Sequence, residues 1–156
     1  MVPKLAKTDF EIRQAMDVDQ LLYDLWDSRI PINVEQIANA WGVEIVRGDD
    51  GENLTQVEDK EGGGVQIRIP LGEPLEDQRL RIAHALGRLL QMNRKETPAN
   101  PDVDAREEAL RILMPEEVIT YLVRERGIRD PDPLANTLQV NTQLVRIRLE
   151  QLGFGA

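Results

Sequence analysis

Near the middle of the chain stands Arg81-Ile82-Ala83-His84-Ala85-Leu86-Gly87-Arg88, which contains the only histidine of the protein. Apolar residues continue at helical spacing on both sides, from Leu75 to about Met92. The sequence therefore predicts an amphipathic helix over this range. Because positions four apart share one face of a helix, His84 and Arg88 are expected on the same face.

A zinc-binding helix of the H-E-x-x-H type needs two histidines four residues apart and a glutamate that takes a proton from the metal-bound water. In this sequence the three positions hold His84, Ala85 and Arg88. Ala85 occupies the general-base position but cannot accept a proton, and a guanidinium offers only donors, so Arg88 cannot ligate a cation. The stretch predicts a zinc-peptidase fold without catalytic residues.

The composition predicts one domain. The chain has 156 residues, 41% of them hydrophobic, no cysteine, and a formal net charge of -9. This size suits one core, and the negative charge disfavours nucleic acid and anionic membranes as partners. Without an apolar run of about 20 residues, or the apolar core of a signal peptide, we expect a cytoplasmic protein with no membrane partner.

The first third of the sequence predicts helices followed by a strand. Apolar spacing indicates one bent or two short helices over 8–27, with capping boxes at Thr8/Glu11 and Asp17/Gln20. Asn33 is expected to cap a helix over 34–41 that Gly42 ends. A strand follows over 43–47, and Gly48-Asp49-Asp50-Gly51 predicts a turn.

Two further segments complete a small sheet. Residues 54–58 are expected to pair with the strand at 43–47, and 65–69 alternates as a third strand. After the central helix the pattern predicts helices over 102–114, 115–126, 134–138 and 142–152. The predicted fold class is therefore α+β, a mainly helical single domain with a sheet of about three strands.

Four blocks of the sequence resemble the ImmA/IrrE family of metallopeptidase domains. The first, 31–45, is similar to the family's opening helix and strand. The second runs from Gly64 through Leu90 and contains the family's R-F-T-x-A-H-E-L-G-H motif in degenerate form. The residues in register with that motif are Arg79, Leu80, Ala83, His84, Leu86 and Gly87.

The third block, 104–115, resembles E-A-N-x-F-A-x-x-L-L-M-P, whose leading glutamate is the third metal ligand in the family. Asp104 takes that position, so His84, Arg88 and Asp104 are the vestigial metal positions. The fourth block, 134–153, is similar to the family's closing segment. The resemblance implies a zincin-like core over 31–153, within one domain over 1–156 whose residues 1–30 form a helical N-terminal extension.

Active relatives in this gluzincin-like family cleave helix-turn-helix repressors and thereby switch on phage, mobile-element or stress genes. For this chain the resemblance implies a pseudo-peptidase that binds such a protein without cutting it, with no cofactor and no bound metal. In a gluzincin, an exposed edge strand holds the substrate by backbone pairing. The expected binding residues are Val65, Ile67 and Ile69 of such a strand, with His84 and Arg88 on the helix.

Two expectations concern the charges on the central helix. An ion pair between Arg88 and Asp104 could fill the place of the metal and tie two helices together. The other basic residues on or just after this helix are expected on its solvated face: Arg79, Arg81, Arg94 and Lys95.

Two alternative functions remain open at this point. The first is an active metallopeptidase that uses zinc held by His84, Asp104 and Asp102. The second is a DNA-binding or DNA-mimicking transcription regulator, suggested by the helix pair over 134–153 with Arg146 and Arg148.

Overall fold

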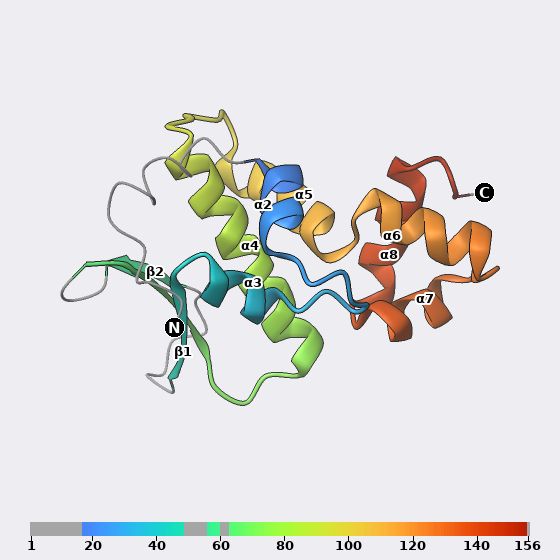
Figure 1. Cartoon of the computed structure of the whole chain (residues 1–156), viewed down its shortest axis with the longest axis horizontal. Helices are drawn as coiled ribbons and strands as arrows, with labels where there is room; N and C mark the ends of the chain where they lie inside the picture. The colour runs from blue at the N-terminus through green and yellow to red at the C-terminus, as the bar shows by residue number, and fades with distance from the viewer. Residues whose placement is uncertain (1–16, 49–55, 60–62, 156) are drawn as a thin grey trace.

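The computed structural model describes residues 17–48, 56–59 and 63–155, and these residues form helices around one small sheet. In Figure 1 the sheet lies at one end of the molecule, the long helix α4 runs through the middle, and α6, α7 and α8 lie at the other end. This arrangement confirms the predicted α+β class. The elements are α2 (Val18–Leu25), α3 (Val34–Ala40), β1 (Val43–Gly48), β2 (Gln56–Asp59), β3 (Val65–Pro70), α4 (Leu75–Asn93), α5 (Pro101–Leu113), α6 (Glu116–Thr120), the π-helix η2 (Tyr121–Glu125), α7 (Pro131–Leu138) and α8 (Thr142–Gln151).

The helix starts that the sequence predicts are present in the structure. The Asp17 side chain accepts a hydrogen bond from the Gln20 backbone N–H, and Asn33 accepts one from Gln36. Gly42 ends α3 with a φ of 89°, a left-handed conformation that costs glycine no steric strain. The predicted Thr8/Glu11 box and the turn residues 49–51 lie outside the described residues.

The strand order is β1-β3-β2, which differs from the predicted pairing. The segment ending at Glu58 was expected beside β1, yet β2 pairs with β3 in antiparallel fashion, and β1 pairs with β3 in parallel. Parallel pairing needs a long connection between the two strands, and residues 49–64 supply it. Partner choice between strands is a long-range property, and the alternation of side chains within each strand does not encode it.

The central position of β3 overturns the expected edge strand. Val65 faces Val43 on one side and Asp59 on the other, and Ile67 is likewise paired on both sides. Ile67 and Ile69 are also fully buried in the core. Val65 and Ile67 are therefore paired on both sides and offer no free edge to an extended peptide, and Ile69 pairs with Arg47 and is buried.

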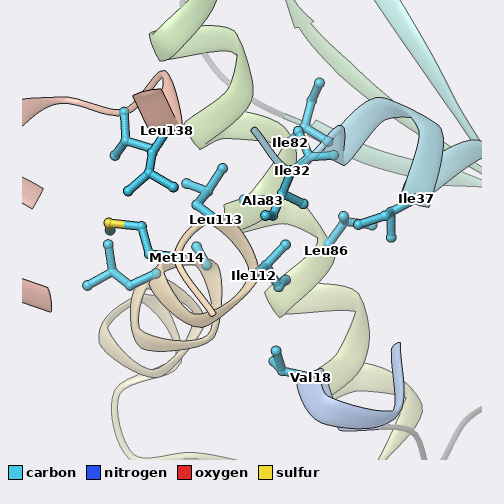
Figure 2. Packing of buried hydrophobic residues seen from close by; sticks show 14 of the residues in the cluster. Val18, Ile32, Ile37, Ile82, Ala83, Leu86, Ile112, Leu113, Met114 and Leu138 are labelled. Carbon is cyan, nitrogen blue, oxygen red and sulfur yellow. The ribbon is translucent and has the colours of Figure 1, made fainter. Parts of the chain in front are cut away.

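The core is built around α4. Figure 2 shows Ala83 and Leu86 of α4 toward Leu113 and Ile112 of α5, and Ile82 beside Ile32, all within the buried cluster. Within the predicted N-terminal extension, α2 buries apolar side chains in the same core and contacts α3 and α5. Figure 2 labels further members of this cluster: Val18, Ile32, Ile37, Met114 and Leu138.

Gly87 sets how closely α4 and α5 approach. A Cβ atom added there would lie 2.7 Å from the backbone oxygen of Ala105 and 3.3 Å from Cβ of Glu108. The first contact is with backbone, so a side chain at position 87 would push the two helices apart. This requirement explains a glycine in mid-helix, where glycine costs about 1 kcal/mol relative to alanine.

The C-terminal part contains one departure from the predicted helix over 115–126. The helix begins as α6 but continues as the π-helix η2, in which the Arg126 N–H donates to the Tyr121 carbonyl. Short π-helical turns are rare and occur frequently at functional sites. Among the described residues, no helix is both long enough and apolar enough to cross a membrane.

We predict that Gly87→Val lowers the free energy of unfolding by about 1 to 3 kcal/mol, because the added side chain overpacks the helix contact. Urea denaturation followed by circular dichroism measures this. Gly48→Val is the matched control, since its Cβ would meet only the flexible end of the Arg68 side chain. A Gly87→Val variant as stable as the Gly48→Val control would contradict the close approach.

Candidate functional site

The helix α4 presents the vestigial residues as expected on one face. His84 and Arg88 are both half-buried, whereas Ala85 is buried in the core. Arg88 Nη1 donates to Oε1 of Gln91 at 3.4 Å, and Gln91 Nε2 donates to the Pro101 carbonyl at 3.4 Å. At the general-base position the buried Ala85 side chain offers no group that accepts a proton, and at position 88 the guanidinium already donates to Gln91.

Asp104 does not complete the site. It is exposed in the first turn of α5, and no ion pair joins it to Arg88 among the described residues, so the predicted Arg88–Asp104 pair is wrong. Asp102, the other carboxylate considered, is exposed in the same turn. The described part of the chain contains no group of three His, Cys, Asp or Glu side chains arranged to hold a metal.

The ion pair between α4 and α5 is made by other residues. Arg94, at the end of α4, pairs with Glu108 of α5 and with Glu96. Burial raises the pKa of Glu108, against the lowering by the Arg94 hydrogen bond. The Arg94–Glu108 pair therefore ties the two helices together near the C-terminal end of α4.

Arg79 is the residue whose role the sequence pattern missed. It was expected on a solvated face but is 7% exposed and donates to the backbone carbonyls of Ile32, Leu138 and Gln139. Burial lowers the pKa of this guanidinium. Arg79 joins the start of α4 to the entry of α3 and to the C-terminal end of α7. Its only signal in the sequence was its register with the family motif.

A wide hollow lies away from His84. A groove of about 1090 Å³ runs between α2, the α6–η2 segment and α8, and it is lined by Tyr23, Trp26 and Tyr121 with charged residues between them. Tyr23 is 87% exposed and Tyr121 is 43% exposed. We call this hollow the aromatic groove. The π-helix η2 forms part of its wall through Tyr121.

The charges along the aromatic groove are mixed. Arg111 lies 3.4 Å from Asp19, and Arg148 Nε donates to the Met114 carbonyl at 2.8 Å. The guanidinium of Arg124 stacks on the Phe154 ring. The groove thus combines exposed aromatic side chains with charged groups of both signs.

No protein-family model, curated protein or solved structure matches the chain. The likeness to the ImmA/IrrE family therefore rests on the four sequence blocks alone.

We predict that Arg94→Ala lowers the free energy of unfolding by about 1.5 to 3 kcal/mol, the range for a lost hydrogen bond to a charged group. Arg88→Ala, in the same helix, should change it by less than about 0.5 kcal/mol, because the hydrogen bond from Arg88 to Gln91 is long, at 3.4 Å. Parallel denaturation curves compare the two. Equal losses of unfolding free energy in the two variants would contradict this and show that Arg88 stabilises the fold as much as Arg94 does.

We further predict that Arg88→His creates a zinc site. It places a second imidazole four residues from His84 on the same helix face, where the two can ligate one ion. Zinc at 100 times its dissociation constant should then stabilise the variant by about 2.7 kcal/mol. Thermal unfolding with and without zinc measures this, with His84→Ala/Arg88→His as control. An unchanged melting temperature would show that the two positions do not converge.

Proposed function

We propose that the chain is a non-catalytic member of an ImmA/IrrE-like family that regulates phage, mobile-element or stress genes by binding a protein. The proposal starts from the chemistry of α4. Peptide hydrolysis at zinc needs three ligands and a base, and here Ala85 and Arg88 remove one base and one ligand. Asp104 is exposed and, among the described residues, forms no ion pair with Arg88, which also supports loss of hydrolysis.

The single observation that carries the binding role is the aromatic groove. Exposed tyrosines beside a hollow of about 1090 Å³ are typical of interaction surfaces, since tyrosine and tryptophan supply large rigid contact areas there. Tyr23 in particular exposes most of its ring, and an aromatic ring in water adds no stability to the helix that carries it. We place the partner on this groove, because β3 is an inner strand and offers no edge.

The proposed partner is a helix-turn-helix repressor, which is what active relatives recognise. The chain would sequester or reshape this regulator, and binding alone would change transcription. No metal, cofactor or covalent step enters this mechanism. Regulation would depend on the concentrations of the two proteins and on the affinity between them.

We predict that Tyr23→Ser/Tyr121→Ser weakens binding of a helix-turn-helix repressor by about 30-fold, since two hot-spot side chains together contribute 2 kcal/mol or more. Isothermal titration calorimetry with the purified repressor measures the affinity. Met92→Ser/Val103→Ser is the matched control, because both residues are also exposed apolar side chains. Equal weakening of binding by the two double variants would show that the aromatic groove is not the docking surface.

A further inference from the structure

A second, smaller pocket lies beside Arg79 and is separate from both the aromatic groove and the His84 face. It has a volume of about 250 Å³ and lies between the start of α3, the first turns of α4 and the residue after α7. Its apolar lining comes from Pro31, Val34, Leu75 and Ile82. Arg79 is the buried charged residue of this lining.

Arg79 is a buried cation without a counter-charge. A guanidinium has five N–H donors, and three of them donate to the carbonyls of Ile32, Leu138 and Gln139. Within the described part of the chain, no carboxylate forms an ion pair with Arg79, and its two other N–H groups have no acceptor. Burying a cation beside neutral groups alone costs free energy that an anion would recover.

The carboxylate that lines the pocket, Glu35, already has a partner. Glu35 accepts two hydrogen bonds from Arg47, at 3.0 and 2.8 Å, and the Arg47 hydrogen bond lowers the pKa of Glu35. Arg47 in turn donates from Nε to Gln78 at 2.9 Å. The charges of Glu35 and Arg47 therefore neutralise each other. Among the residues that line the pocket, the positive charge of Arg79 is left without a negative partner.

We propose that this pocket binds a small molecule with one carboxylate and an apolar body, the carboxylate accepting hydrogen bonds from Arg79. The apolar side chains take the body of the ligand, and the side-chain amide of Asn33 lies in the same lining. The volume equals that of about eight water molecules, so it suits a short branched acid or the last residue of a peptide. Both sources share a carboxylate next to an aliphatic group.

Calorimetry with the full chain tests this with three probes. The probes are 4-methylpentanoate as a free acid, N-acetyl-leucine as a peptide C-terminus, and 4-methylpentanamide as the neutral match of the first. We expect at least one of the two carboxylates to bind ten times more tightly than the amide. The tighter of the two identifies the source. Equal affinity for acid and amide, or no binding of either carboxylate, would overturn the proposal.

A pair of variants locates the binding without touching Arg79. Leu75→Trp enlarges a side chain that lines the pocket and is 56% exposed, so it fills the mouth while the fold stays intact. Leu71→Trp is the control, at a residue 60% exposed in the turn before α4 and outside the lining. We expect the first to weaken carboxylate binding more than tenfold and the second less than twofold. Equal effects would place the carboxylate elsewhere and refute the pocket.

Discussion

The contact between α4 and α5 at Gly87 is the constraint on which the rest of the structure depends. Without a Cβ at that position the α5 backbone reaches the α4 surface, and the apolar faces of both helices then close over one core. β3 and α3 pack on α4 elsewhere, and α2 packs on α5. Arg94 and Glu108 reinforce this contact at the end of α4. A larger residue at position 87 would therefore disturb the sheet side and the helical side together.

The local features were predictable because neighbouring residues determine them. Asp17 and Asn33 cap their helices by hydrogen bonds three residues away, and α4 follows from its own apolar spacing. The pairing of β2 with β3 was not predictable, since it joins segments across a connection whose length does not specify a partner. Arg79 was missed for the same reason: its three acceptors lie 47 to 60 residues away.

The candidate site followed the same division. The sequence predicted that His84 and Arg88 share a helix face and that Ala85 stands where a base is needed, and these depend on one helix. The Arg88–Asp104 pair required two helices in a particular register, and the structure instead pairs Arg94 with Glu108. The aromatic groove is assembled from α2, α6, η2 and α8, so no single stretch of the sequence predicts it. The proposed binding role is assigned to this groove, which does not include the vestigial residues.

The central claim is that this chain binds its protein partner and does not cut it. The most direct measurement is the intact mass of a helix-turn-helix repressor after prolonged incubation with an equimolar amount of the protein and excess zinc. Native mass spectrometry of the same mixture reports whether a complex has formed. The account predicts a complex that contains full-length repressor. Repressor fragments that disappear when a chelator is added would contradict it.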